Sequence, residues 1–341
     1  MLADGVSFTH ALVALLPVLC FLGLLLLLDS YKLIRPGVVL LILGTGVLAA
    51  VASTLVSAAA LGPLSMDMAT YSSHVAPLVE ELLKGLIIVA LARSHRIGFL
   101  VDAAIFGFAV GCGFALLENL AYLQLAREAE LSTWIVRGFG TALMHGGATA
   151  SLAVMGLSVL DRNPDAGPVV FLPGLAVSVA LHWGFNFLTL WPVVATLATL
   201  LIVPALLLWV FHRSEQTLAR WLGQGFDADA RMLELINSGA FQGSPAGQYL
   251  LTLRQSFSPA MMADALCYLR IYTELALRAK GLLMLREHEL PVPPTDALTR
   301  AKLEELRYLE SSIGATALRA LQPMLHMRRE ELWQLNLLQS E

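Results

Sequence analysis

The stretch VDAAIFGFAVGCGFALLENLAYL, residues 101–123, decides the fold class of this chain. A helix needs about 20 mostly apolar residues to cross the hydrocarbon of a bilayer, and Asp102 and Glu118 are the only acidic or basic residues in this stretch. Gly107, Gly111 and Glu118 share one helical face, and glycines at four-residue spacing are typical of close helix packing in membranes. We therefore expect a transmembrane helix whose Glu118 faces protein instead of lipid.

Six further windows have the same character. Together the predicted spans cover approximately residues 9–28, 37–59, 75–92, 97–123, 133–160, 168–190 and 192–211. The composition agrees, because 57% of the residues are hydrophobic and 14% are charged, whereas about 25% are charged in a typical soluble protein. The sequence predicts an all-α fold: a polytopic membrane helix bundle of about seven transmembrane helices, with a C-terminal soluble helical domain.

The composition changes after Phe211. The first 211 residues contain 8 Lys/Arg and 11 Asp/Glu, whereas the last 130 contain 14 and 15. Ser258-Pro259, a capping residue before a proline, predicts a helix that runs to about Glu289. We expect a transmembrane domain at residues 1–211 and a soluble helical domain at 212–341. The net charge of −4, with acids and bases mixed along the tail, argues against a nucleic-acid partner.

The basic residues of the loops predict the orientation of the bundle. If the spans alternate, one side of the membrane receives Lys32, Arg35, Arg93, Arg96, Arg162 and Arg213. Only Arg127 lies clearly in a loop on the other side. Because short loops rich in Lys and Arg stay in the cytoplasm, we expect the N-terminus outside and residues 212–341 in the cytoplasm.

Ionisable and amide side chains lie inside four consecutive spans. They are Glu80, Glu81 and Lys84, then Asp102, Glu118 and Asn119, then Arg137 and His145, and finally His182 and Asn186. A charge at the bilayer centre costs on the order of 3 kcal/mol, so each is a hypothesis for a functional site. Glu80 and Lys84 are helical neighbours, so that one acid can pair with the lysine while the other stays free. Asp102 is close enough to the start of its span to be a helix-start residue.

The polar positions recur at helical spacing and at matched depth. Arg137 and His145 belong to one four-residue series, and His182 and Asn186 to another. Two histidines and a carboxylate are the ligands that Zn²⁺ takes in open catalytic sites, and a second carboxylate can remove a proton from water. Taken singly, the same residues also fit an internal ion pair, hydrogen bonds between helices or a snorkelling arginine.

Four motifs occur in order along residues 71–190. They are Glu80-Glu81-x-x-Lys84, the segment from Asp102 to Tyr122 with Phe114-x-x-x-Glu118-Asn119, Arg137 with His145, and His182-x-x-x-Asn186. In this order they resemble the motifs of PrsW-type intramembrane proteases, which are distant relatives of the prenyl-protein CAAX proteases. Where the CAAX enzymes have a histidine four residues after a phenylalanine, this chain has Glu118, as in the PrsW branch.

The resemblance implies an intramembrane endopeptidase of the bacterial inner (cytoplasmic) membrane. Its substrate would be a membrane protein, often an anti-sigma factor. The predicted orientation and the depth of the polar residues, and not the resemblance, predict a cut near the extracytoplasmic boundary. The resemblance also implies Zn²⁺ held by Glu118, His145 and His182, with Glu80 or Glu81 as the base and Asn186 at the oxyanion. Whether Glu118 or His145 replaces the CAAX histidine stays open at this point, and a glutamate-activated water without a metal is the mechanistic rival.

Two other classes of function fit part of the pattern. A non-proteolytic membrane scaffold or maturation factor of the same fold would use residues 212–341 to recruit a cytoplasmic partner. A proton-coupled transporter would use the buried carboxylates as a relay, but it should consist of two related halves with broken helices, and the sequence has no such repeat. The substrate and the oligomeric state are not readable from the residues.

Overall fold

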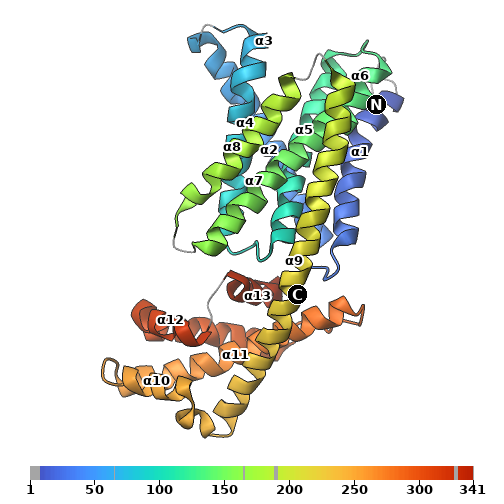
Figure 1. Ribbon diagram of the computed structural model, residues 1–341. Helices are drawn as coiled ribbons and strands as arrows, with labels where there is room; N and C mark the ends of the chain where they lie inside the picture. Colours follow the sequence, from blue (N-terminus) through green and yellow to red (C-terminus); the bar gives the residue numbers. More distant parts are fainter. Residues whose placement is uncertain (1–7, 65, 164–165, 188–190, 326–328, 341) are drawn as a thin grey trace. The chain divides into compact units, whose positions relative to one another are not determined.

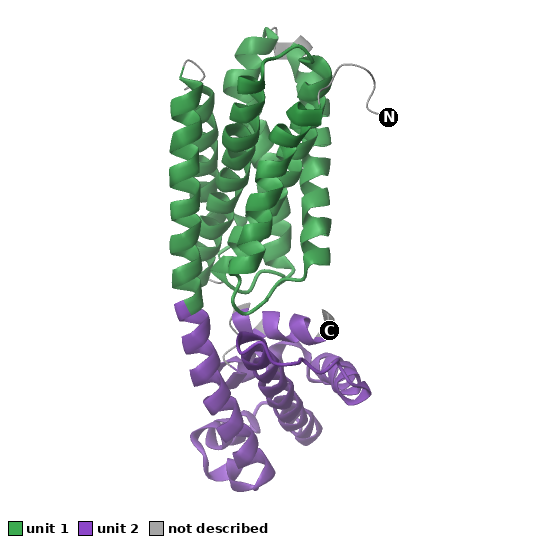
Figure 2. Ribbon diagram, turned by 90° about the vertical axis from the view of Figure 1, so that its right-hand side faces the viewer, with its two compact units in different colours: residues 1–215 green, residues 216–341 purple. Residues whose placement is uncertain are grey.

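The computed structural model describes residues 8–64, 66–163, 166–187, 191–325 and 329–340. Every regular element in these ranges is a helix, as predicted. The chain divides into two compact units, residues 1–215 and 216–341 (Figure 2). Helix α9 contributes to both units, because it runs from Pro192 to Asn237. The predicted end of the last span at residue 211 is therefore a change in composition and not a break in the helix.

The helices of unit 1 form an elongated bundle (Figure 1). They begin with α1 (Phe8–Leu28), α2 (Pro36–Leu64), α3 (Met68–Thr70), the π-helix η1 (Tyr71–Val75) and α4 (Ala76–Arg93). They continue with α5 (Leu100–Leu125), α6 (Leu131–Ile135), the π-helix η2 (Val136–Thr141), α7 (Ala142–Arg162), η3 (Pro168–Phe171), α8 (Leu172–Phe187) and the first part of α9.

Within the described residues, six helical segments are long and apolar enough to cross a membrane. The expected seventh span, residues 75–92, is α4. This helix is 18 residues long and contains four charged residues, Glu80, Glu81, Lys84 and Arg93, which exclude it from the six. The chain is an integral membrane protein, and the count of seven holds only if α4 crosses with its charges covered by neighbouring helices.

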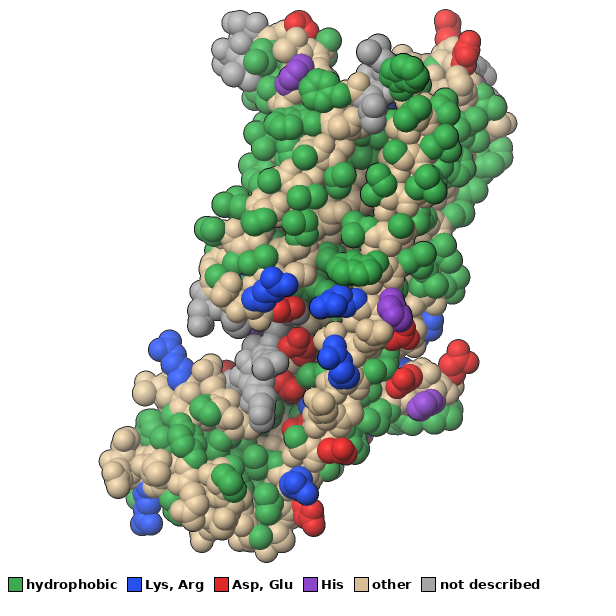
Figure 3. All heavy atoms as spheres, in the orientation of Figure 1, with side chains coloured by type: hydrophobic (Ala, Val, Ile, Leu, Met, Phe, Trp, Pro, Cys, Tyr) green, Lys and Arg blue, Asp and Glu red, His purple; other side chains and the backbone are tan. Residues whose placement is uncertain are grey.

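Helix α5 is the centre of the bundle. Within its most apolar window 83% of the residues are buried, against 22% for α1. The glycines of the stretch explain the packing, because a Cβ on Gly111 would strike the carbonyl of His145 and one on Gly107 would meet the backbone of Ala150. On the outside, hydrophobic side chains cover the visible face of α8 and of the unit 1 part of α9, as a lipid-facing surface requires (Figure 3).

Unit 2 consists of the rest of α9 and the helices that follow it. They are η5 (Ala240–Gly243), α10 (Pro245–Leu253), α11 (Pro259–Glu287), α12 (Ala297–Leu325) and α13 (Arg329–Ser340). The prediction for α11 is confirmed, since the hydroxyl of Ser258 accepts a hydrogen bond from the amide of Met261 and Pro259 is the first helical residue. Leucine-rich faces of α11 and α12, including Leu269, Leu275 and Leu306, form its core.

One buried ion cluster ties three helices of unit 2 together. The Nζ atom of Lys280 lies 2.6 Å from Oδ2 of Asp229 and 3.3 Å from Oε2 of Glu331, and the side chain is almost fully buried. The indole N–H of Trp221 donates to the other oxygen of Glu331 at 2.9 Å. Burial raises the pKa of Glu331 above its ordinary value, although the charge of Lys280 opposes the shift.

Candidate active site

Glu81 on α4 is completely buried, and polar side chains contact both oxygens of its carboxylate. Lys84 donates to Oε1 at 2.6 Å, and the hydroxyl of Ser178 on α8 donates to Oε2 at 2.5 Å. Nδ1 of His182, one turn further along α8, lies 3.0 Å from Oε1. The lysine therefore pairs with Glu81, three positions away, and the expected pairing with Glu80 is wrong. This carboxylate is occupied in orienting Lys84 and His182.

Glu80 is the acid that stays free. Its Oε2 atom is buried and has no hydrogen-bond partner among the described residues, and it lies 4.0 Å from Nε2 of His182. A buried carboxylate oxygen without a donor is costly. Because Glu81 holds the Nδ1 side of His182, the Nε2 atom is the one presented to Glu80. Oε2 of Glu80 and Nε2 of His182 could therefore serve together as ligand atoms for a cation.

His145 on α7 connects the two carboxylate-bearing helices, α4 and α5. Its Nδ1 lies 2.9 Å from Nζ of Lys84, and its Nε2 lies 3.1 Å from Oε2 of Glu118 on α5. The His145 and His182 rings stand almost perpendicular, with their centroids 4.7 Å apart. Lys84 also lies over the ring of Phe114, at 4.1 Å from its centroid. The contact of Lys84 with His145 was not foreseen, since helical spacing reports neighbours only within one helix.

Three of the expected site residues form a group with metal-ligand geometry. One oxygen of Glu80 and one nitrogen each of His145 and His182 all lie within 4.8 Å of one another. Two imidazole nitrogens and a carboxylate oxygen suit a divalent transition metal with an open position. Counting formal charges, Glu80, Glu81 and Glu118 exceed Lys84 and Arg137 by one negative charge, which a bound cation would compensate. The residues therefore fit a metal.

The remaining expected residues lie at the edge of this group. Glu118 contacts His145 but does not belong to the three-residue group, and 28% of its side chain is exposed. Asn186 lies one turn after His182 on α8 and is half-buried, and its amide makes no hydrogen bond to the part of the chain that the structure describes. Asp102 accepts from the amides of Gly98 and Phe99, which confirms it as a helix-start residue.

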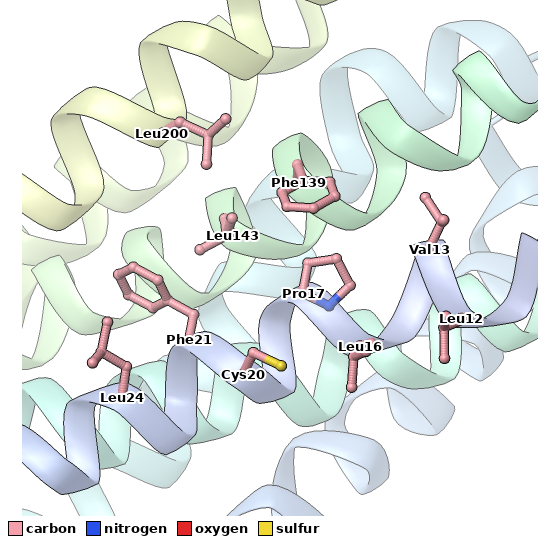
Figure 4. Close-up of a pocket in the computed structure, with 10 residues that line it drawn as sticks. All are labelled: Leu12, Val13, Leu16, Pro17, Cys20, Phe21, Leu24, Phe139, Leu143 and Leu200. Carbon is pink, nitrogen blue, oxygen red and sulfur yellow. The ribbon is translucent and has the colours of Figure 1, made fainter. Parts of the chain in front are cut away.

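An apolar groove of about 420 Å³ lies on another face of the bundle. Its walls are formed by α1 together with Phe139, Leu143 and Leu200 (Figure 4). None of the polar residues described above lines this groove. The groove is therefore separate from the polar residues of α4, α5, α7 and α8.

Comparison with known proteins agrees with this geometry. The family described as PrsW family intramembrane metalloprotease matches residues 35–211, just over half of the chain. The matched range contains α4, α5, α7 and α8 and with them the whole polar site. No curated protein and no solved structure matches the chain. The chain belongs to the PrsW family of intramembrane metalloproteases and is a peptidase of the membrane.

Proposed function

We propose that the protein is a zinc-dependent endopeptidase that cuts a membrane-protein substrate, with the metal held by Glu80, His145 and His182. The mutual approach of these three donors to within 4.8 Å carries the proposal. The unpartnered oxygen of Glu80 supports it as well. Three protein ligands leave a position for water, as hydrolytic zinc sites require. The divalent metal follows from the family, and zinc is our choice because histidine and carboxylate suit it.

We assign Glu80 and Glu118 the reverse of the roles expected from the sequence. Glu80 becomes a ligand in this proposal because it lies near both histidines. Glu118 becomes the general base because it is partly exposed and touches His145. Glu81 acts indirectly, because a carboxylate that accepts from the far nitrogen of a ligand histidine fixes the ring and its tautomer. It holds Nδ1 of His182 at 3.0 Å.

The reaction is peptide-bond hydrolysis. When bound, the metal supplies a Lewis acid that polarises the scissile carbonyl and activates water. Glu118 takes a proton from the attacking water and delivers it to the leaving amine. The free amide of Asn186 donates to the carbonyl oxygen as charge develops there. Lys84, held between Glu81 and His145, keeps positive charge beside the carboxylates.

The distribution of loop charges supports a site that faces outward. With basic loops in the cytoplasm, α4 begins and α5 ends at the extracytoplasmic side. Glu80 lies four residues after Ala76, and Glu118 lies seven before Leu125, so both are within about 6–11 Å of that end at 1.5 Å per residue. A membrane-spanning substrate, for which a bacterial anti-sigma factor is our proposal, would be cut near its extracytoplasmic boundary in the inner membrane. Unit 2 would then lie in the cytoplasm, where it is available to a partner.

The test is a co-reconstituted cleavage assay together with metal analysis of the purified protein. We expect about one zinc per wild-type chain, and loss of both metal and cleavage in Glu80→Gln and in the double variant His145→Ala, His182→Ala. Glu118→Gln should keep the metal and lose cleavage. Glu128→Gln is the matched control, since this acid is exposed in the loop between α5 and α6. If Glu80→Gln and the double variant retain metal and Glu118→Gln cleaves at the wild-type rate, the proposed site is wrong.

A further inference from the structure

Arg137 is a largely but not fully buried arginine beside the proposed base. It lies in the π-helix η2, only 13% of its side chain is exposed, and its Nη2 atom lies 3.4 Å from Oε2 of Glu118. The same oxygen of Glu118 lies 3.1 Å from Nε2 of His145. One carboxylate oxygen therefore separates the guanidinium from the site histidine. A snorkelling arginine would instead extend its charge to the interface.

Asn119 and Tyr122 hold the guanidinium of Arg137 on two further sides. The Nε–H of Arg137 donates to Oδ1 of Asn119 at 2.9 Å. The plane of the guanidinium lies over the ring of Tyr122, with Cζ at 3.6 Å from the ring centroid. Asn119 and Tyr122 follow Glu118 on α5, one and four positions later. Helix α5 therefore carries both the proposed base and the two residues that hold Arg137. A planar guanidinium can use an amide, a ring face and a carboxylate together.

The first helix, α1, fixes this support from the other side. The amide nitrogen of Asn119 donates to the backbone carbonyl of Ala14 at 2.8 Å, which settles the orientation of its oxygen toward Arg137. The backbone of Val13 packs so closely on Gly138, the residue after Arg137, that a Cβ there would strike its carbonyl. Helix α1 lies outside the residues that match the family. It nevertheless reaches the site through Asn119 and η2.

We propose that Arg137 is a positioning residue for Glu118 and that α1 holds Arg137 in place. The inference rests on the proposed role of Glu118 as the base. The guanidinium holds the Glu118 carboxylate so that one of its oxygens faces the site histidine. Because its own position is set by the carbonyl of Ala14 through Asn119, displacement of α1 changes the base without touching the metal ligands.

The first test compares Arg137→Gln, Arg137→Lys and Glu118→Gln in the cleavage assay. Loss of a supporting partner costs roughly 10- to 100-fold in activity, so Arg137→Gln should lower kcat by that factor with KM and metal content unchanged. Arg137→Lys should retain more activity than Arg137→Gln, because lysine keeps the positive charge but lacks the planar guanidinium with its several donors. In the Glu118→Gln background, Arg137→Gln should cause no further loss, because the two residues act as a unit. Arg127→Gln, in an exposed loop, is the control.

The second test moves α1 without altering Arg137. The Gly138→Ala substitution in η2 forces the backbone of Val13 in α1 away. In contrast, the new side chain of Gly23→Ala, in α1 itself, enters open space. We expect a lower kcat and unchanged metal content in the first variant, and wild-type values in the second. The comparison of Gly138→Ala with Gly23→Ala still tests the inference if the Arg137→Gln variant does not accumulate.

The outcomes separate this inference from the proposed function. A wild-type protein that neither cleaves nor binds metal, or a fully active Glu118→Gln, contradicts the proposed function. If wild type cleaves and Glu118→Gln does not, the positioning role is overturned by a fully active Arg137→Gln, by a lysine variant no better than the glutamine variant, or by equal losses in both backgrounds. A fully active Gly138→Ala overturns the part played by α1.

Discussion

The ammonium of Lys84 lies 2.6 Å from a carboxylate oxygen of Glu81, and both side chains are completely buried. A buried pair is weak support for stability as long as both charges are present, but removal of one partner leaves the other charge without compensation. Lys84 also contacts His145. The pair therefore connects α4 with the two histidine-bearing helices, α7 and α8. It also distinguishes the adjacent acids, because Glu81 is bound to Lys84 and Glu80 is not.

Glu81→Gln and Glu80→Gln should consequently fail in different ways. Loss of the Glu81 charge leaves the buried ammonium of Lys84 without its counter-charge, and breaking a buried pair costs about 3–5 kcal/mol. The Glu81→Gln variant should therefore accumulate poorly and melt at a lower temperature than wild type in detergent. Glu80→Gln removes an acid that has no donor on its buried oxygen and should melt at or above the wild-type temperature without metal. Equal melting temperatures for the two variants would contradict this assignment.

Ser178→Ala tests the support of Glu81 from α8. The hydroxyl donates to Oε2 of Glu81, so its removal frees the carboxylate to turn and loosens the hold on His182. Outer partners of this kind are worth roughly 10- to 100-fold in metal affinity. Titration with a competing chelator measures the change. Ser158→Ala is the matched control, since that hydroxyl bonds only to a carbonyl of its own helix, and a wild-type affinity for Ser178→Ala would refute the supporting role.

Gly111→Ala should disrupt the contact between α5 and α7. A Cβ at this position meets the carbonyl of His145, which is backbone and cannot rotate away. The variant should accumulate less, and the fraction that folds should lose metal because His145 shifts. Gly44→Ala in α2 points into open space and should be neutral. The amount of protein in purified membranes, followed by metal analysis, compares the two, and normal metal content in Gly111→Ala would exclude a shift of His145.

Unit 2 should fold as a separate fragment with a defined acid sensitivity. Burial raises the pKa of Glu274, but hydrogen bonds and charges from Lys302 and Arg270 outweigh it and leave the pKa below its ordinary value of 4.5. The folded state then binds fewer protons than the unfolded state, so the stability that Glu274 contributes is present above pH 4.5 and is lost as the pH falls through the lower pKa of the folded state.

We therefore expect Glu274→Gln in a fragment of residues 216–341 to be less stable than wild type at pH 7, by about 1 kcal/mol or less for a partly exposed pair. The difference should shrink at pH 3. Urea unfolding followed by circular dichroism measures it, and Glu304→Gln, at an exposed position of α12, should show little change at either pH. A fragment that is unfolded at pH 7 would contradict the independence of unit 2.

The orientation is open to single-cysteine labelling. In a background without the three native cysteines, Ser72→Cys and Glu128→Cys should react with a membrane-impermeant thiol reagent added to intact cells. Ser94→Cys and Asn163→Cys should react only after permeabilisation, because their loops carry the basic residues. All four side chains are at exposed positions, with Ser94 and Asn163 directly after α4 and α7. The reverse labelling pattern would overturn the outward-facing site.

The local part of this structure was predictable from the sequence. Hydropathy over 20 residues and the 3.6-residue period are properties of short segments, so the apolar spans, the glycine face of α5 and the polar faces of α7 and α8 could be recognised without a structure. The start of α11 at Ser258-Pro259 was predicted for the same reason. The extension of α9 to Asn237 was not, because a change from lipid to water alters composition without ending a helix.

The sequence by itself therefore determined an all-helical membrane bundle and the set of polar residues that share its interior. Only the tertiary structure decided how those residues pair: Lys84 with Glu81 and His145, Glu118 with His145 and Arg137, and Glu80 with the two histidines. Apart from the pair of Lys84 with Glu81, these contacts join different helices, and the helices of the site can be far apart in the chain: Glu81 and His182 are 101 positions apart. Which oxygen faces which nitrogen depends on how the helices cross and how closely they approach, and no local pattern in the chain contains that information.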